Sequence, residues 1–371
     1  MRIALVCPYS CTVPGGVQAQ TLGLARTFRH MGDDVAVVAP AESRSLGAAL
    51  DESALEGARF LRVGASLALP VNGSRAPVSP WPRTMSRTLA ALAGFAPEVV
   101  HVQEPFVPGP SLAATWRGPR PLVATLHRSG AGPAYRLYGR AVGSLSRRLD
   151  EVVAVSPEAR ATAEACLPML SGRISIVPNG VEVSRIAAVQ PWPSAEPTIA
   201  FVGRHESRKG LEVLLEAFSG LTVPARLWVL GSGPETARLS ARFADDGRIE
   251  WIGAADDEQR ARRLAGADLF VAPSLGGESF GVVLLEAMAA GTAVVASDIA
   301  GYRRAGGDAV RLVPPGRPEE LRRAMAELLS DDAARAALVA QGRLRAAEHD
   351  MARTAASYRE LFAHLLAGDR S

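Results

Sequence analysis

The sequence predicts an α/β protein of two parallel-sheet domains, and three observations point to this fold class. The chain has 371 residues, more than one ordinary core needs and suited to two domains of roughly 150 residues each. Short apolar runs alternate with amphipathic stretches, as expected of parallel strands covered by helices on both faces. This rhythm lapses over residues 177–197, which are rich in proline and turn residues, and then restarts.

In the first half, a helix is expected over residues 17–32, because apolar residues recur at helical spacing up to Gly32. Strands are expected where short apolar runs are bounded by turn residues: 2–8, 34–40, 98–105, 121–127 and 151–156. We place the first domain at residues 1–177, with Rossmann-like topology.

The second half repeats the pattern, and we place a second Rossmann-like domain at residues 178–351. Its expected strands are 198–204, 226–233, 249–254, 268–274, 292–298 and 309–315. The last segment, residues 352–371, contains an amphipathic helix that can pack back on the first domain. Two open α/β sheets facing across a cleft bind ligands beyond the carboxyl ends of their strands, so chemistry is expected in the loops after strands.

Composition excludes several classes of protein. The net charge is +3 and no run of five or six like charges occurs, so no nucleic-acid partner is expected. The three cysteines form no CxxC pair, which argues against a disulfide framework and a zinc site. No run of about 18 apolar residues and no signal peptide is visible, so we expect a cytoplasmic protein.

Glu278 and Glu286 lie in a stretch that runs from a glycine-containing turn into a helix ending at Gly291. The positions three and four residues from Glu286 on that helix are apolar, and no cation accompanies it there. A carboxylate on an apolar helix face is costly unless groups donate hydrogen bonds to it, and a ribose diol offers two hydroxyl donors. A helix-entrance carboxylate alone would explain Glu278, but the pair favours a ligand role for both.

The turn before this helix has a further expected role. The backbone N–H groups of Ser279, Phe280 and Gly281 would lie at the positive end of the helix, where phosphate or sugar oxygens bind.

Lys209 is the only lysine among 41 basic residues, and it lies with Arg204 in the loop after the strand at 198–204. Arginine holds phosphate oxygens bidentately, whereas lysine supplies a compact charge on a slim stem. Two cations of different reach can neutralise a diphosphate leaving group. A solvated loop charge is the alternative interpretation.

Other loops carry weaker indications. Gly15 and Gly16, after the first strand, permit close approach of a ligand to the backbone, although a Gly-Gly turn is also an ordinary connector. His127 ends the strand at 121–127, where a structural role is the alternative. Gly231 and Gly233 resemble a dinucleotide fingerprint, but Thr236 occupies the third glycine position.

With these residues in place, the chain resembles the retaining glycosyltransferases of the GT-B fold, glycosyltransferase family 4, over nearly its whole length. Within that family it most resembles the bacterial phosphatidyl-myo-inositol mannosyltransferases. The motifs that carry the family resemblance are the E-x7-E pair Glu278 and Glu286, GRHESRKG at 203–210, VPNGV at 177–181, and PGGVQ at 14–18. The closer resemblance rests on CPYS at 7–10, VPGGVQ at 13–18, NGS at 72–74, GGESFG at 276–281 and EAMAAGTAVVASD at 286–298.

The resemblance implies a role for each site residue. Arg204 and Lys209 would bind the donor pyrophosphate, Glu278 the sugar hydroxyls and Glu286 the ribose, while His127 would lie beside the reacting centre. The remaining implied contacts are the phosphate at Gly16, the nucleobase at Asp256, Asp257 and Arg260, and the acceptor at Tyr9, Gln18 and Asn72. No metal ligand set and no tightly bound cofactor are expected, with Mg²⁺ at most stimulatory.

The implied reaction moves a hexosyl unit, favoured as mannosyl from GDP-mannose, to a hydroxyl acceptor such as a (phosphatidyl)inositol. The alternatives are a UDP-sugar donor with a soluble natural-product or polysaccharide acceptor, a nucleotide-sugar epimerase, and a dinucleotide oxidoreductase. Only Arg75, Arg83 and Arg87 occur in the region where the mannosyltransferases carry a basic membrane helix. We therefore expect at most weak peripheral contact with the inner membrane face.

Overall fold

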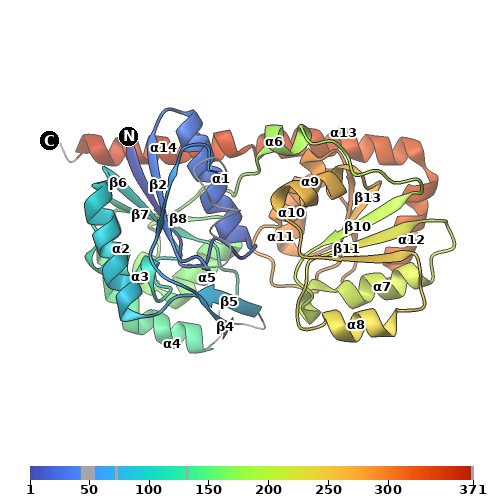
Figure 1. Cartoon of the computed structure of the whole chain (residues 1–371), viewed down its shortest axis with the longest axis horizontal. Helices are drawn as coiled ribbons and strands as arrows, with labels where there is room; N and C mark the ends of the chain where they lie inside the picture. The colour runs from blue at the N-terminus through green and yellow to red at the C-terminus, as the bar shows by residue number, and fades with distance from the viewer. Residues whose placement is uncertain (43–54, 72–73, 131–132, 369–371) are drawn as a thin grey trace. The chain divides into compact units, whose positions relative to one another are not determined.

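The computed structural model describes residues 1–42, 55–71, 74–130 and 133–368, which form two compact units (Figure 1). Unit 1 comprises Met1–Gly180 together with Met351–Ser371, and unit 2 comprises Val181–Asp350. Each unit contains a parallel sheet with helices on both faces, so the predicted fold class is confirmed.

The sheet of unit 1 has seven parallel strands in the order β3-β2-β1-β6-β7-β8-β9. In the centre, Ile3 of β1 pairs with Val35 of β2 on one side and Val99 of β6 on the other. The strands are β1 (Arg2–Val6), β2 (Asp34–Ala39), β3 (Arg59–Arg62), β6 (Val99–Gln103), β7 (Leu122–Leu126), β8 (Glu151–Ala154) and β9 (Ile174–Ile176).

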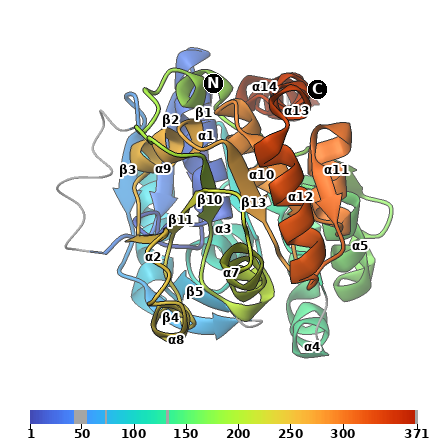
Figure 2. The same cartoon turned by 90° about the vertical axis from the view of Figure 1, so that its right-hand side faces the viewer.

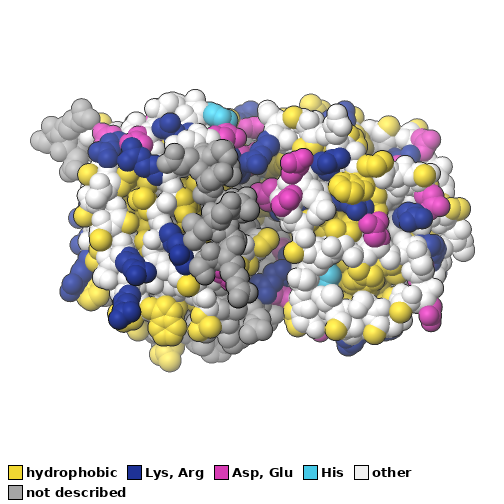
Figure 3. Space-filling model, in the orientation of Figure 1, with side chains coloured by type: hydrophobic (Ala, Val, Ile, Leu, Met, Phe, Trp, Pro, Cys, Tyr) yellow, Lys and Arg dark blue, Asp and Glu magenta, His cyan; other side chains and the backbone are white. Residues whose placement is uncertain are grey.

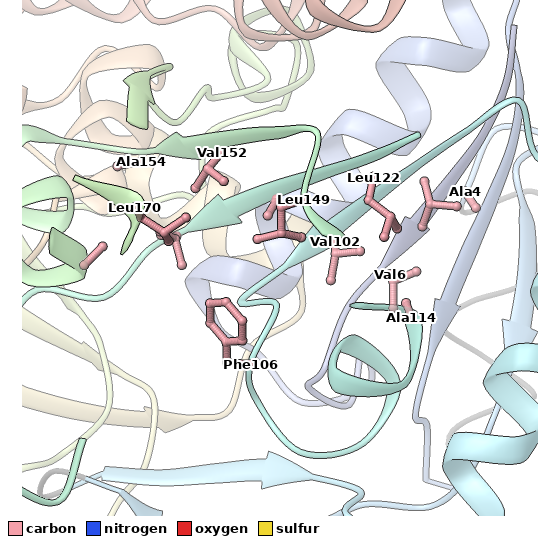
Figure 4. Close-up of a cluster of buried hydrophobic side chains, with 14 of the residues drawn as sticks. Ala4, Val6, Val102, Phe106, Ala114, Leu122, Leu149, Val152, Ala154 and Leu170 are labelled. Atoms are coloured by element: carbon pink, nitrogen blue, oxygen red, sulfur yellow. The ribbon is translucent and has the colours of Figure 1, made fainter. Parts of the chain in front are cut away.

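Successive side chains of these strands enter two apolar layers, because neighbouring strand residues point to opposite faces. Alternate residues such as Ala4 and Val102 face one layer (Figure 4), whereas Ile3 and Leu5 face the other. Helices α2 (Pro82–Phe95), α3 (Pro110–Arg117) and α5 (Pro157–Cys166) cover the first face, and α1 (Gly16–His30) and α14 (Met351–Gly368) cover the second. The C-terminal helix is therefore part of the core of unit 1.

The sheet of unit 2 has six parallel strands in the order β12-β11-β10-β13-β14-β15. Because β10 and β13 are neighbours, the loops that follow them leave the same edge of the sheet side by side. The strands are β10 (Thr198–Val202), β11 (Arg226–Leu230), β12 (Ile249–Gly253), β13 (Leu269–Ala272), β14 (Ala293–Ser297) and β15 (Arg311–Val313).

Two helical layers also cover this sheet. Helices α7 (Leu211–Ser219), α8 (Thr236–Arg242) and α12 (Pro318–Ser330) pack on one face, and α9 (Asp257–Ala265), α10 (Val282–Ala289) and α11 (Ala300–Gly306) on the other. Helices α11 and α13 (Asp332–Glu348) both contact α10. Figure 2 shows α9 and α7 on opposite sides of β10 and β11. On the visible surface of this unit, basic and acidic side chains are interspersed (Figure 3).

All predicted strands are present, although most are one to three residues shorter than expected. The sequence pattern missed β3, β9, the separate hairpin of β4 (Leu67–Val71) and β5 (Ser74–Val78), and α6 (Val183–Ala187) within the proline-rich segment. Strands β3 and β9 are only four and three residues long, too short for periodicity to identify. Within the described part of the chain, no helix is long and apolar enough to cross a membrane.

Candidate functional site

In unit 2, the loops after β10 and β13 form the candidate donor site. The β10 loop turns through a short 3-10 helix, Ser207–Lys209, and Leu275 of the β13 loop donates its backbone N–H to the carbonyl of Arg208 over 2.7 Å. Gly210 has φ +69°, and a Cβ there would lie 2.0 Å from the carbonyl oxygen of Pro273. Only glycine permits this approach, which fixes the position of the neighbouring Lys209.

Two cationic side chains of the β10 loop form ion pairs with Glu278. Its Oε1 lies 2.8 Å from both the Nζ of Lys209 and the Nη1 of Arg208, and the Oγ of Ser274 donates to it over 3.4 Å. Burial alone would raise the pKa of Glu278, but Lys209 and Arg208 outweigh it and lower the pKa below the ordinary value. Glu278 is therefore an ionised acceptor for hydroxyl donors.

Sequence reasoning missed Glu206 and Arg208, which complete this cluster. The buried Glu206 lies between two arginines, with Oε1 3.0 Å from the Nε of Arg204 and Oε2 3.1 Å from the Nε of Arg208. The three cations and two carboxylates of this charge cluster, Arg204, Glu206, Arg208, Lys209 and Glu278, carry a net charge of +1. The alternation of Arg204, Glu206 and Arg208 in the sequence was the signal that could have revealed it.

Glu286 has a cation partner, so the expectation that none accompanies it is wrong. Its Oε1 lies 3.1 Å from the Nη2 of Arg260 on α9, whose Nη1 lies 3.1 Å from the Oδ1 of Asp257. The helix positions around Glu286 are apolar as read from the sequence, but the partner comes from a neighbouring helix. Burial nevertheless dominates and raises the pKa of Glu286, with Arg260 opposing and Asp257 and Glu182 adding to the rise.

The turn before α10 contains the other predicted donor contacts. Gly281 caps the helix with φ +95°, and Ser279 is half-buried. The side chain of Phe280 is buried in the core of unit 2 and lies edge-on to His349, with ring centroids 5.4 Å apart. Phe280 can therefore contribute to a ligand site only through its backbone. Asp256 accepts the Gln259 N–H over 2.7 Å and caps α9.

Gly231 and Gly233 have a structural explanation. Gly231 has φ +113°, and a Cβ there would lie 2.0 Å from the carbonyl oxygen of Gly203; a Cβ at Gly233 would lie 2.6 Å from that of His205. The loop after β11 therefore packs backbone against backbone on the β10 loop. These glycines serve loop packing, and the dinucleotide interpretation loses its one sequence argument.

In unit 1, the loop after β1 leads into α1. A Cβ at Gly16 would meet no atom within 4 Å, so the backbone there borders open space. Gln18 is buried, and its Nε2 donates to the carbonyls of Val13 over 3.1 Å and Ser10 over 3.4 Å. Tyr9 forms an isolated β-bridge with Val78. Gln18 thus stabilises the loop itself, and Asn72 lies outside the described residues.

His127 directly follows β7 and is nearly buried. Its Nε2 lies 2.7 Å from the Oε1 of Gln103, and its backbone N–H donates over 2.7 Å to the Oε1 of Glu104, which adopts φ +47°. Burial lowers the pKa of His127 to about 4, so the ring is neutral at pH 7. Gln103 and Glu104 were not predicted as site residues, although they lie near the end of the strand expected at 98–105.

The structure thus brings together Arg204, Lys209 and Glu278 in one cluster of unit 2, and Asp257, Arg260 and Glu286 in a second. Gly16, Gln18, Tyr9 and His127 belong to unit 1. Among the described residues, no three His, Cys, Asp or Glu side chains are grouped so that they could hold a metal ion.

Comparisons with known proteins concern the family and the fold. Residues 14–185 match the sequence profile described as Glycosyltransferase Family 4, and residues 196–331 match the profile described as Glycosyl transferases group 1. A phosphatidyl-myo-inositol mannosyltransferase of Mycolicibacterium smegmatis is 36% identical over 94% of this chain and 90% of its own.

Among solved structures, sucrose-phosphate synthase from Thermosynechococcus elongatus is similar with a TM-score of 0.78, at 22% identity over 99% of each chain. Anabaena Alr3699/HepE, solved in complex with UDP and glucose, is similar with a TM-score of 0.75 at 18% identity, over 98% of this chain and all of its own. At these identities the structural likeness concerns the fold.

Proposed function

Since this chain belongs to glycosyltransferase family 4 and has the GT-B fold, we propose that it transfers mannose from GDP-mannose to an inositol-containing acceptor with retention of configuration. Transfer of a hexosyl group from a nucleotide sugar follows from the family. The mannosyl and inositol assignments go beyond the family: we propose them because of the 36% identical relative.

The observation that carries the proposal is the charge cluster around Glu278. A diphosphate at this edge of the sheet would meet Lys209 and Arg204, whose side chains are 19% and 37% exposed. Cations already positioned by Glu206 and Glu278 can neutralise the leaving phosphate without reorganising as charge develops. Glu278, kept ionised by the same cations, would accept hydrogen bonds from the sugar hydroxyls.

The raised pKa of Glu286 supports its proposed contact with the ribose. Burial penalises the carboxylate even beside Arg260, and two hydroxyl donors would lower that penalty by hydrogen bonding to the charged form. Asp257 and Arg260 would then border the nucleobase. The energetic cost of Glu286 in the free protein is offset in the nucleotide complex.

The proposed chemical step needs no protein nucleophile. The bond between the sugar C1 and the leaving phosphate oxygen breaks while the acceptor hydroxyl oxygen bonds to C1 on the same face. The acceptor proton passes to the leaving phosphate oxygen. In unit 1, His127 would serve the acceptor hydroxyl as a neutral imidazole, and Tyr9 would contact the acceptor.

A thermal-shift panel of GDP, UDP, ADP, TDP and NAD, followed by a transfer assay, tests the proposal. A ligand that binds only the folded state raises the melting temperature. We expect GDP to stabilise the wild type and not Lys209→Ala, and GDP-mannose to be consumed only when an inositol acceptor is present. Stabilisation by UDP alone would contradict the mannosyl assignment, and donor turnover without acceptor would favour the epimerase.

The acceptor assay should compare free inositol with phosphatidylinositol in vesicles. Arg83 and Arg87 lie on α2, which begins beside Trp81, whose side chain is 54% exposed. So few basic residues give modest attraction to an anionic surface, about 1 kcal/mol each. We therefore expect weak vesicle binding; tight, salt-sensitive binding would contradict this.

A further inference from the structure

We infer that a buried chain of hydrogen bonds anchors His127 to the C-terminal helix α14 and holds its ring as the neutral tautomer with the proton on Nε2. The inference deepens the proposed function, on which it rests, because His127 matters to transfer only if it lies beside the reacting centre. It assigns positioning roles to Gln103, His101, Thr125 and Tyr358.

The chain of contacts is continuous across three elements. The Oη of Tyr358 on α14 lies 2.8 Å from the Oγ1 of Thr125 on β7, which lies 2.7 Å from the Nε2 of His101 on β6. The Nε2 of Gln103 lies 3.2 Å from the same His101 nitrogen, and its Oε1 lies 2.7 Å from the Nε2 of His127. Each link is within hydrogen-bonding distance.

The chemistry of the amide gives the chain a direction. The NH2 group of Gln103 can only donate, so the Nε2 of His101 accepts from it and from the hydroxyl of Thr125. The proton of His101 is then on Nδ1, which is buried and has no hydrogen-bond partner among the described residues. The hydroxyl of Tyr358 then donates to Thr125. At the other end the Gln103 carbonyl accepts, so the Nε2 of His127 carries the proton. His127 is left with Nδ1 as its acceptor.

Burial keeps water from competing for the hydrogen bonds of this chain. Gln103, Thr125 and His101 are at most 1% exposed, and Tyr358 is 3% exposed. The rings of His101 and Tyr358 also pack together, with centroids 4.4 Å apart. In the described part of the chain, Thr125 is the one hydrogen-bond partner of the Tyr358 hydroxyl, so Tyr358 donates to Thr125 and the Thr125 proton goes to the Nε2 of His101. An inverted Gln103 amide would then set its carbonyl oxygen against the lone pair of that nitrogen.

The consequence for the reaction is a defined role for the imidazole. With the proton fixed on Nε2, the ring can accept a hydrogen bond from an acceptor hydroxyl through Nδ1 but cannot donate one from that atom. The backbone bond from His127 to Glu104 fixes the same residue from its other side. His127 would thus orient the hydroxyl whose oxygen attacks C1.

The test measures the tautomer directly by long-range ¹H–¹⁵N NMR of imidazole-labelled protein near pH 7. His127 is identified among the six histidines by the signal lost in His127→Asn. The test variants are Thr125→Val, which removes the central hydroxyl at constant shape, and Tyr358→Phe, which removes the distal one. Thr125→Ser restores a hydroxyl. The matched control is Thr88→Val, because the buried Thr88 donates only within α2, to the carbonyl of Thr84.

We expect the Nε2–H tautomer in the wild type and in Thr88→Val, and a mixture of tautomers in Thr125→Val and Tyr358→Phe. In the transfer assay kcat should fall about tenfold in Thr125→Val with little change in the donor KM, and Thr125→Ser should recover most of it. Wild-type protein with the proton on Nδ1, or an unchanged tautomer and kcat in Thr125→Val, would overturn the inference.

The tautomer is read in the free protein, so it separates this inference from the proposed function. If the wild type shows the expected tautomer but consumes no GDP-mannose, the proposed function fails and the anchoring of His127 stands. If transfer occurs while Tyr358→Phe keeps the wild-type tautomer and rate, the link to α14 is wrong.

Discussion

At the scale of single residues, the geometry around Glu278 explains why this loop has a lysine, although every other Lys or Arg position in the chain is an arginine. Arg208 and Lys209 are adjacent in sequence and reach the same Oε1 atom of Glu278, each at 2.8 Å. A guanidinium already occupies one approach to that oxygen. The smaller ammonium fits beside it, whereas a second planar guanidinium would compete for the same space.

We predict that Lys209→Ala lowers kcat/KM for transfer by about a hundredfold or more, and Lys209→Arg by about tenfold, because in the proposed mechanism the cation would stabilise charge that develops on the leaving group. Arg238→Ala is the control, since Arg238 pairs with Glu212 and Glu235 on the surface. Steady-state kinetics measures all three. A Lys209→Ala enzyme with wild-type kcat/KM would remove Lys209 from the site.

We predict that Glu286→Gln weakens nucleotide binding about tenfold to a hundredfold, as expected for loss of a charged hydrogen-bond acceptor. Its stability at pH 7 should nevertheless be no lower than that of the wild type. Burial raises the pKa of Glu286 in the folded protein above its ordinary 4.5. In the pH window between the ordinary and the raised pKa, the folded state therefore binds more protons than the unfolded chain. The free energy of unfolding of the wild type therefore falls as pH rises through the window.

Urea unfolding at pH 4.5 and pH 7.5, with nucleotide titration alongside, checks this second prediction. Glutamine does not titrate, so the stability of Glu286→Gln relative to the wild type should increase between the two pH values. A relative stability that decreases with pH would mean that Arg260 outweighs burial in the folded protein.

At the scale of elements, the candidate site residues are concentrated where strands end. The loops after β10 and β13 carry Arg204, Lys209 and Glu278, while those after β6 and β7 carry Glu104 and His127. Parallel strands place their carboxyl ends at one edge of a sheet, so residues far apart in sequence become neighbours. Backbone geometry then sets which side chains meet, as the close contact between Gly210 and Pro273 illustrates.

We predict that Gly210→Ala destabilises unit 2 by about 2 kcal/mol or more and abolishes transfer, because its Cβ would overlap the carbonyl of Pro273 at a positive φ. Gly247→Ala is the matched control: Gly247 is an exposed turn glycine outside the positive-φ region, where an added Cβ would meet no atom within 4 Å. Denaturant unfolding and the transfer assay give both quantities. Equal stability of the two variants would contradict the packing argument.

At the scale of the whole molecule, the chain begins and ends in the same unit. Helix α14 contributes Met351, Ala355, Tyr358 and Phe362 to an apolar layer shared with α1 and the sheet of unit 1. The N–H of Val181 bonds the carbonyl of His349 over 2.9 Å, so the two chain segments at this end of unit 2 run together. The integrity of unit 1 therefore depends on the last segment of the sequence.

We predict that Phe362→Ala, which empties a fully buried position, destabilises unit 1 by about 3–5 kcal/mol. Leu344→Ala on α13, at a side chain 72% exposed, should change stability by less than about 0.5 kcal/mol. Hydrogen exchange with peptide resolution separates the units: protection should fall in β1, β6 and α1 and persist in β10 and β13. Equal loss in both units would show that they unfold as one.

The sequence by itself determined the two α/β units, the positions of most strands along the chain, and the loops that carry the candidate site residues. It could do so because these features depend on local periodicity and on the rule that parallel strands end together. It also singled out Lys209, Glu278 and Glu286, because a unique lysine and carboxylates beside apolar residues can be read directly from the amino-acid sequence.

Only the tertiary structure decided which groups are partners. The pairing of Glu286 with Arg260, the bridging of Arg204 and Arg208 by Glu206, and the chain from His127 to Tyr358 all join separate elements or depend on how a loop folds. Hydrogen bonds and ion pairs act over about 3 Å, whereas these partners are up to 233 positions apart along the chain. Their proximity comes from packing of the sheets and helices, which no local pattern of residues specifies.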